Sequence, residues 1–102
     1  AFTSTEVEGL TLVAGTEITL AFEAGRLAVD AGCNAMTAGF AIDDGTLEVE
    51  GFASTLMGCP DDRARQDAAV QDFLAGGPAM TLDGDVLTLT GQGITLTARE
   101  QP

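Results

Sequence analysis

ITLAFEAGRLAV, residues 18–29, alternates apolar and polar side chains on both sides of a single Ala-Gly pair. Alternation with a period of two places every second side chain on the same face, which is typical of a strand buried on one side. The Ala24-Gly25 pair between the two runs indicates a hairpin turn. This stretch therefore predicts two neighbouring antiparallel strands.

The same alternation recurs along most of the chain. Further runs are separated by turn sequences rich in Gly and Asp, at intervals of roughly 8–12 residues, which favours a sandwich or barrel. The residues expected on one face of these later strands are Met36, Ala38, Phe40, Ile42, Leu47, Val49, Met80, Leu82, Leu87, Leu89, Ile94 and Leu96. We predict a mainly β (α+β) fold, a strongly curved antiparallel sheet or small barrel with one α-helix packed against it. A lipocalin-like or inhibitor-like closed barrel is the alternative architecture.

One segment, residues 60–75, has helical rather than strand periodicity. Its apolar residues recur three and four positions apart, at Ala69, Val70, Phe73 and Leu74. Asp61 or Asp62 is expected to cap the first turn, and the Gly-Gly-Pro sequence at 76–78 is expected to end the helix. The remaining side chains form a mixed polar face that is expected to be solvated: Arg63, Arg65, Gln66, Asp67, Gln71 and Asp72. Residues 1–102 are expected to form a single domain.

The chain is strongly acidic, with a net charge of −12 and only four basic residues, all arginine. Nucleic acids and anionic lipids are bound through Lys and Arg, so we exclude nucleic acid and an electrostatic membrane contact. The acidity fits either solubility or a high-salt source. We expect a monomer.

Catalytic and metal chemistry has few candidates in this sequence. The absence of histidine removes a Ser-His-Asp arrangement, a His-assisted catalytic thiol and an ordinary structural zinc set. Asp83-Gly84-Asp85 is only a fragment of a calcium loop, and Asp-Gly is also what a tight hairpin requires. We therefore expect no enzyme activity, no catalytic residues, no metal and no cofactor.

The two cysteines, Cys33 and Cys59, allow two interpretations: a disulfide or two buried thiols. A disulfide suits a small exported domain, and we expect one. No apolar run approaches the roughly 20 residues that span a bilayer. Because the chain starts at Ala1 rather than Met, we expect a processed or trimmed form, with any export signal or lipid anchor outside it.

The cysteines lie in two short runs, Gly32-Cys33-Asn34 and Ser54-Thr55-Leu56-Met57-Gly58-Cys59. Together with Gly39-Phe40, Gln66-Asp67 and Phe73-Leu74, these runs resemble the META domain family, which includes the HslJ-like bacterial heat-shock lipoproteins. The resemblance extends from Val7 to Ala98. It implies a curved antiparallel sheet or barrel with one helix, a cell-envelope (periplasmic) or secreted setting, and a loose link to stress response. It implies no enzymatic activity.

The chain departs from the family pattern at three positions. Phe2 stands where an N-terminal Trp is common, and Ala35 where a larger polar residue follows Gly-Cys-Asn. Leu56 stands where a basic residue often follows the Ser-Thr pair. A family binding surface built on that basic group would be altered here, whereas the expected fold would not.

The motif residues are expected to act structurally: Gly32, Asn34, Gly39, Ser54, Thr55, Met57 and Gln66. Asn34 and Thr55 suit the crossing of the two cysteine segments, because Asn and Thr side chains bond nearby backbone groups. A polar pocket beside the cross-link is the alternative. Arg63 and Arg65 belong to a solvated helix surface or, alternatively, to a face that docks an acidic partner.

Two function classes follow from these observations. The first is a non-catalytic envelope or secreted META-type domain that acts in stress response or as an interaction or stability module. The second is a small-ligand-binding or hydrolase-inhibitor β-barrel. The partner would be a protein or a small ligand. A filled core with exposed apolar side chains favours the first class, and a hydrophobic cavity with convergent polar groups favours the second.

Overall fold

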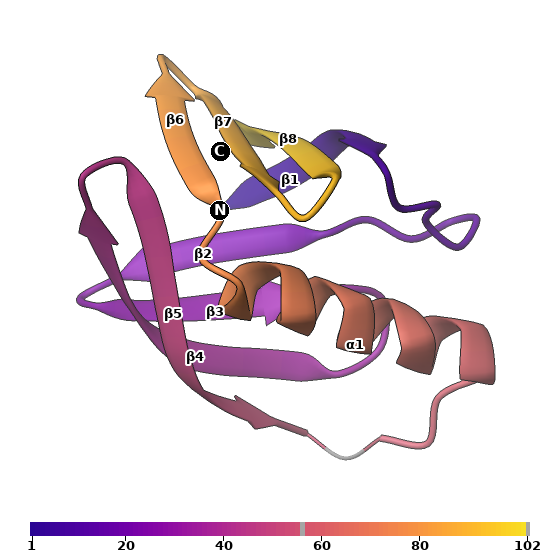
Figure 1. Ribbon diagram of the computed structural model, residues 1–102. Coiled ribbons are helices and arrows are strands. Elements are labelled where there is room, and N and C mark those ends of the chain that lie inside the picture. The colour runs from indigo at the N-terminus through magenta and orange to yellow at the C-terminus, as the bar shows by residue number, and fades with distance from the viewer. Residues whose placement is uncertain (56, 102) are drawn as a thin grey trace.

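The computed structural model describes residues 1–55 and 57–101, which form a mainly β fold with one helix lying against the strands (Figure 1). The helix, α1, spans Asp61–Ala75. The strands, in chain order, are β1 (Phe2–Glu8), β2 (Thr19–Glu23), β3 (Arg26–Asp30), β4 (Ala35–Asp43), β5 (Thr46–Ser54), β6 (Ala79–Asp83), β7 (Val86–Gly91) and β8 (Ile94–Glu100).

All strand pairs are antiparallel, and the sheet curves until its last strand meets its first. Each strand pairs with the next one in sequence, and β8 returns to pair with β1. The β1–β8 register runs from Phe2 opposite Glu100 to Glu8 opposite Thr95, with an irregularity between Ser4 and Glu6. The predicted strongly curved antiparallel sheet with one helix is confirmed.

Among the described residues, the ring is narrowest at the seam between β5 and β6, followed by the β1–β2 pair, which has two register pairs. Strands β5 and β6 share a single register pair, Thr46 opposite Ala79. The seam also holds two backbone hydrogen bonds, from Leu47 N to Pro78 O at 2.9 Å and from Met80 N to Gly45 O at 2.7 Å. Since α1 lies between β5 and β6 in sequence, the chain leaves the sheet after β5, forms the helix and returns as β6 beside β5. Figure 1 shows β2–β5 and the group formed by β6–β8 and β1 as two halves that diverge at this seam.

The hairpin turns lie where their sequences predicted them. Ala24-Gly25, Asp44-Gly45 and Gln92-Gly93 each have positive φ at both positions. Two consecutive positive φ values define the type I′ turn, whose twist matches that of the flanking strands. These turns fix the register of three of the hairpins.

The core is built from alternate strand residues, as the period-two pattern predicted. Leu27, Val29, Leu47, Leu87 and Leu89 are at most 3 % exposed. They belong to one cluster that also contains Ile18, Leu20, Ala31, Met36, Ala38, Val49, Val70, Phe73, Leu74, Leu96 and Ala98. The interior between sheet and helix is therefore occupied by packed side chains.

Two residues that the alternation places on the core face are exposed instead. Ile42 is 54 % exposed and Leu82 is 59 % exposed. Each lies one residue before the end of its strand, next to the tight turn that follows, where the hairpin extends past the packed interior. Alternation predicts the face of a strand but not where along the strand the core ends.

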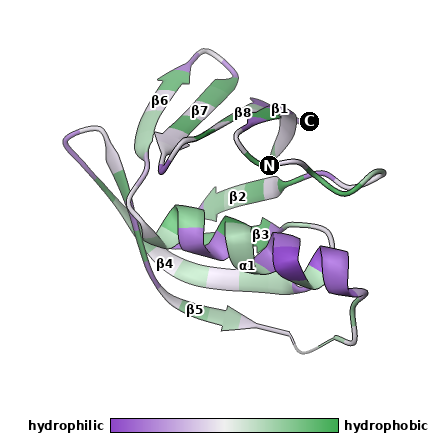
Figure 2. Cartoon of the chain, turned by 45° about the vertical axis from the view of Figure 1, so that its right-hand side comes forward, coloured by the Kyte–Doolittle hydropathy of each residue, from purple (hydrophilic) through white to green (hydrophobic). Residues whose placement is uncertain are grey.

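The helix buries the face that its spacing predicted, with Val70, Phe73 and Leu74 inside and Ala69 partly buried. Figure 2 shows the N-terminal half of α1 as hydrophilic and its C-terminal half as largely hydrophobic. The N-cap residue is Pro60, which makes no side-chain cap bond, whereas Asp62 Oδ1 accepts the first-turn N–H of Arg63 at 2.8 Å. Asp61 and Asp62 lie in the first turn, where their charge complements the helix dipole.

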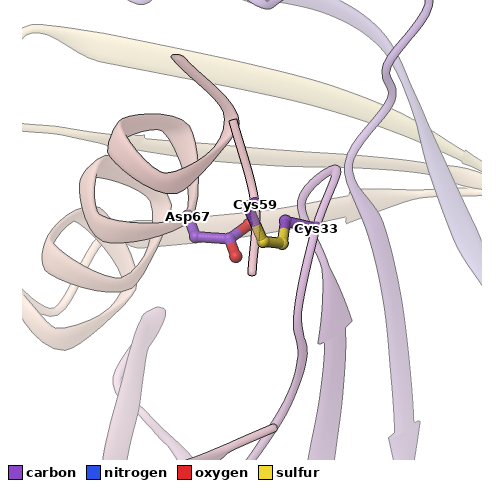
Figure 3. Close-up of side chains that lie close together, drawn as sticks. All are labelled: Cys33, Cys59 and Asp67. Carbon is purple, nitrogen blue, oxygen red and sulfur yellow. A yellow bond between two sulfur atoms is a disulfide. The ribbon is translucent and has the colours of Figure 1, made fainter. Parts of the chain in front are cut away.

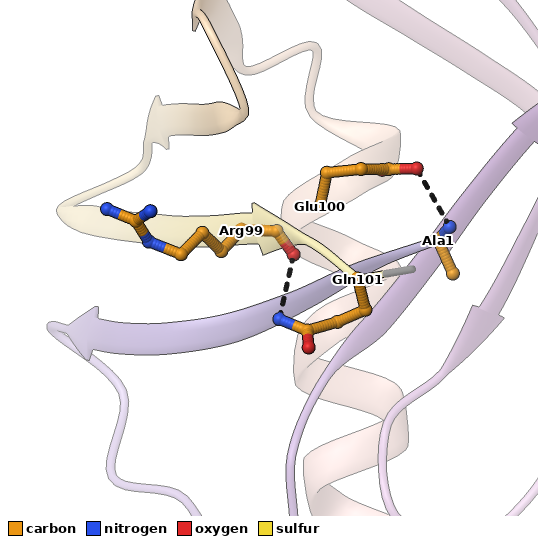
Figure 4. A network of polar contacts seen from close by, with 4 residues as sticks. All are labelled: Ala1, Arg99, Glu100 and Gln101. Atoms are coloured by element: carbon orange, nitrogen blue, oxygen red, sulfur yellow. Dashed lines mark hydrogen bonds and ion pairs between the residues drawn. The ribbon is translucent and has the colours of Figure 1, made fainter.

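The chain ends lie on adjacent strands (Figure 4). The Ala1 ammonium is 3.3 Å from Glu100 Oε1, and Gln101 Nε2 donates to the Arg99 carbonyl oxygen at 3.4 Å. Arg99 and Asp85 form the other ion pair found in the described residues, also at 3.3 Å. Most acidic side chains therefore have no cationic partner among these residues.

This charge excess predicts a salt-dependent stability. We expect the Tm to rise by several degrees, or ~1 kcal/mol, between about 10 mM and about 1 M NaCl, because screening weakens the mutual repulsion of the carboxylates. Circular dichroism melts at constant pH measure this shift. Sucrose melts are the control, because an uncharged osmolyte stabilises without screening. A Tm that does not rise with NaCl would contradict the expectation.

None of the helices in the described part of the chain combines the length and the apolar character needed to cross a bilayer.

Candidate functional site

The two cysteines join the loop after β3 to the segment that leads into α1. Cys33 and Cys59 form a disulfide with Cα atoms 6.1 Å apart, within the range that disulfides normally span. The disulfide interpretation of the cysteines is thus the one that the structure supports. Figure 3 shows the Asp67 carboxylate of α1 pointing toward the two sulfur atoms.

Asn34 links the three segments that meet at the disulfide. Its backbone N–H and its side-chain Nδ2 both donate to Asp67 Oδ2, at 2.9 and 3.3 Å. Its Oδ1 accepts from Thr55 Oγ1 at 3.0 Å and from Met57 N at 2.8 Å. The side-chain amide is therefore fully engaged within the chain and orders the crossing of the two cysteine segments.

Thr55 completes this crossing on the side of β4. Its Oγ1 accepts from Ala35 N at 3.1 Å, and its backbone N–H donates to the Ala35 carbonyl at 3.1 Å. The hydroxyl therefore bonds both Asn34 and the start of β4 and extends the β4–β5 pairing past its end.

Gln66 makes a second polar crossing on the buried face of the helix, next to Asp67. Its Oε1 accepts from Val13 N at 2.7 Å, and its Nε2 donates to Thr16 Oγ1 at 2.9 Å and to the Ala31 carbonyl at 2.7 Å. The side chain is 4 % exposed. One amide thus holds the segment between β1 and β2, and the end of β3, against α1.

The prediction of a fully solvated polar helix face was wrong for two residues. Gln66 and Asp67 are 4 % and 7 % exposed, although the residues around them are polar. The segment 9–17, which lies between β1 and β2, covers this face through its bonds to Gln66. Helical spacing does place both residues on the face of Val70, four and three positions before it, but their polar side chains hid that signal. The covering segment lies some 50 residues earlier in the chain.

Asp67 is the site residue that the sequence did not single out. Its Oδ2 accepts both bonds from Asn34, but its Oδ1 is buried with no hydrogen-bond partner in the described part of the chain. A buried carboxylate oxygen without a donor is costly. Two signals were available: its place directly after Gln66 in the family motif, and its helical spacing three residues before Val70.

The other motif residues, Ser54, Met57 and Gly39, differ in their surroundings. Ser54 Oγ donates to the Thr55 carbonyl, and Met57 is 61 % exposed. Gly39 lies within β4, where it pairs with Arg26 of β3 and Glu50 of β5. Leu56, which occupies the family's basic position, lies outside the described residues.

The two helix arginines differ in their surroundings. Arg63 is partly buried and donates from Nη1 to the Gly32 carbonyl at 3.1 Å, whereas Arg65 is exposed. Arg63 is therefore used at least in part to hold the cysteine loop. A docking face formed by these two residues stays a prediction.

Gly32 occupies a position that requires glycine. Its φ is +113°, and a Cβ there would lie 3.1 Å from Gln66 Nε2 and 3.2 Å from Thr16 Cγ2. We expect Gly32→Ala to destabilise the fold by about 2 kcal/mol, because the left-handed backbone and the crowded Gln66 amide both oppose the methyl group.

Urea unfolding of this variant, with disulfides intact, measures the cost. Gly39→Ala is the matched control, since the nearest atom to a Cβ there is 3.7 Å away and its φ is not positive. Equal stability losses in the two variants would contradict the proposed crowding.

A groove in the described part of the chain lies away from the disulfide, between the β4–β5 pair and the end of α1. It has a volume of about 600 Å³ and is lined by Phe40, Thr46, Glu48 and Glu50 with the glycines that end the helix. It is open to solvent and carries acidic side chains. Within the described residues, Cys33, Cys59 and Asp67 bring three atoms of the kinds that bind metals within 4.8 Å of one another, with the two sulfurs joined in the disulfide.

Comparison with known proteins identifies the kind of domain. The family model of the META domain matches residues 1–102. No curated protein matches the chain. One solved NMR structure is 24 % identical with a TM-score of 0.74 and covers 96 % of this chain and 86 % of that chain. An NMR structure of a protein from Burkholderia xenovorans is 18 % identical with a TM-score of 0.78 and covers 96 % of this chain and 79 % of that chain. At these identities, the two structures support the fold.

Proposed function

This chain belongs to the META domain family, and on that premise we propose that it is a non-catalytic domain of the bacterial cell envelope or the secreted fraction. There it acts in stress response or as an interaction and stability module. The observation that carries the proposal is the disulfide between Cys33 and Cys59, set in a network of internal hydrogen bonds. Disulfides persist in oxidising compartments and are rare in the cytosol.

The use of the polar motif residues supports a structural role for the site. The side chains of Asn34, Thr55 and Gln66 direct their hydrogen bonds to other segments of the same chain. A binding or catalytic site would instead aim polar groups toward a space that a ligand can enter. These internal bonds support a structural role for the motif.

The distribution of apolar side chains favours an interaction module over a ligand-binding barrel. The interior is filled by the core cluster, whereas Ile42, Met57 and Leu82 are more than half exposed. The packed interior favours a module that contacts partners through its surface over a barrel that encloses a ligand. The partner itself is a protein or small ligand of the same compartment.

The compartment and the redox state can be tested together. Cells of the bacterial source are fractionated, and each fraction is quenched in acid to preserve the redox state of its thiols. The fractions are then treated with an alkylating agent, with and without prior reduction. Mass spectrometry of the protein counts the labels. We expect the protein in the envelope or medium fraction, with no label before reduction and two labels after it. A cytosolic protein carrying two labels without reduction would overturn the proposal.

A matched variant controls for cysteine chemistry. Cys33→Ser combined with Cys59→Ser is expected to reach the same fraction and to take no label under either condition. A variant that stays in the cytosol would show that the cross-link, rather than the export route, determines recovery from the envelope.

A further inference from the structure

The disulfide and the unpartnered carboxylate form a compact group of donor atoms. A sulfur of Cys33, a sulfur of Cys59 and a carboxylate oxygen of Asp67 all lie within 4.8 Å of one another (Figure 3). Asp67 is 7 % exposed, and its buried Oδ1 has no hydrogen-bond partner among residues 1–55 and 57–101. The carboxylate is thus already dehydrated and directed at the sulfur atoms.

Asn34 holds two members of this group in place. Its Nδ2 lies 3.3 Å from Asp67 Oδ2 and 3.8 Å from Cys59 Sγ, so one amide contacts both the carboxylate and a sulfur. Donors that bond the outer side of a ligand fix its orientation and strengthen metal binding. This bond leaves Asp67 Oδ1 free to act as a ligand.

From this arrangement we infer that the reduced form of the chain binds one thiophilic divalent cation, such as Zn²⁺ or Co²⁺, through Cys33 Sγ, Cys59 Sγ and Asp67 Oδ1. Thiolate sulfur favours such cations, and three protein ligands leave the fourth tetrahedral position to water. The sequence predicted no metal because the chain has no His, and this proposal differs from that prediction for the reduced form, in which the two sulfurs are free to become thiolate ligands.

The conversion is a balanced two-electron reduction. A phosphine attacks one sulfur and breaks the sulfur–sulfur bond, and hydrolysis then yields the phosphine oxide and two thiols, with the oxygen and two protons supplied by water. The cation then displaces one proton from each thiol to the buffer and takes both thiolates as ligands.

The ligand positions suit this change without a new backbone arrangement. The Cα atoms of Cys33 and Cys59 are 6.1 Å apart, and each sulfur can move by rotation about its own side-chain bonds to bond a metal at about 2.3 Å. The net charge of −12 favours cation approach. Arg63 is the nearby opposing charge, and its Nη1 is engaged by the Gly32 carbonyl.

Cobalt(II) titration of phosphine-reduced protein, desalted under argon, tests the inference. We expect one equivalent of cobalt to bind and to produce the near-ultraviolet charge-transfer absorption of a thiolate–cobalt bond. Zinc should displace it, and the oxidised protein should show no such absorption. Asp67→Asn is expected to weaken binding by ~10-fold or more, because it exchanges a charged ligand for a neutral one.

Two variants separate the site from the acidic surface and from folding. Asp72→Asn, on the exposed side of the same helix, is expected to bind cobalt like the unchanged protein. The double variant of Cys33→Ser and Cys59→Ser lacks the cross-link as the reduced protein does, and it is expected to give no charge-transfer absorption.

Either of two results overturns the inference. The first is a reduced protein that takes up no cobalt, whether or not circular dichroism shows it folded. The second is an Asp67→Asn variant that binds as tightly as the unchanged protein, which would mean that the thiolates alone hold the metal.

Discussion

Replacing Cys33 and Cys59 together by alanine is expected to lower the free energy of unfolding by about 3–4 kcal/mol. The disulfide closes a loop with a sequence separation of 26 residues, and the chain-entropy model assigns that cost to the greater freedom of the unfolded chain. The loss corresponds to a decrease in Tm of roughly 15–25 °C for a domain of this size. It is a large share of the stability that a small domain has.

Urea unfolding of the double variant and of the oxidised parent, followed by circular dichroism, measures this difference. The variant should also have a larger m value, since its unfolded chain exposes more surface. Reduction of the parent is the independent control, because it opens the same loop without replacing the two cysteine side chains. A variant within ~1 kcal/mol of the parent would show that the network around Asn34 alone holds the crossing.

Gln66→Ala is expected to cost about 3 kcal/mol. The substitution removes three hydrogen bonds and leaves Val13 N–H and the Ala31 carbonyl without their partners in a half-buried or buried setting. It also leaves a small cavity between α1 and the segment before β2. The same change should free that segment from the helix.

Two measurements check this prediction. Urea unfolding gives the stability loss, and amide hydrogen exchange of Val13 should become faster by more than the change in global stability explains. Gln71→Ala on the same helix is the matched control, with an expected loss of no more than ~0.5 kcal/mol, because its side chain has no hydrogen bond among those found in the described residues. Equal losses in the two variants would contradict the role assigned to Gln66.

The strands and hairpins were predictable because their signals are local. The alternation that places Leu27 and Val29 inside is a direct consequence of strand geometry, and the positive φ of the turn residues follows from Ala24-Gly25 and its equivalents. β1 was the exception, since Thr3, Ser4 and Thr5 give it no clear apolar alternation. It is held in place by its pairing with β8, at the far end of the chain.

The candidate site was predictable in its membership but not in its geometry. The cysteine runs and Gln66 were recognised as motif residues, and the disulfide was expected. The burial of Asp67 beside the sulfurs was not, because a carboxylate is ordinarily solvated even where helical spacing puts it on the face of Val70 and Leu74. The exposure of Ile42 and Leu82 was also missed, because alternation predicts the face of a strand but not where along the strand the core ends.

By itself, the sequence determined the β-rich character of this protein, its hairpin turns, the bounds of its helix to within one residue, and the residue types available for chemistry. These depend on backbone periodicity and turn geometry, which act over a few neighbouring residues. Only the tertiary structure decided that β8 meets β1, that Gln66 reaches Val13 53 positions away, and that Asp67 faces the disulfide. Contacts of that sequence separation form only when the curved sheet and the helix pack together, and no local pattern encodes which segment will cover a polar face.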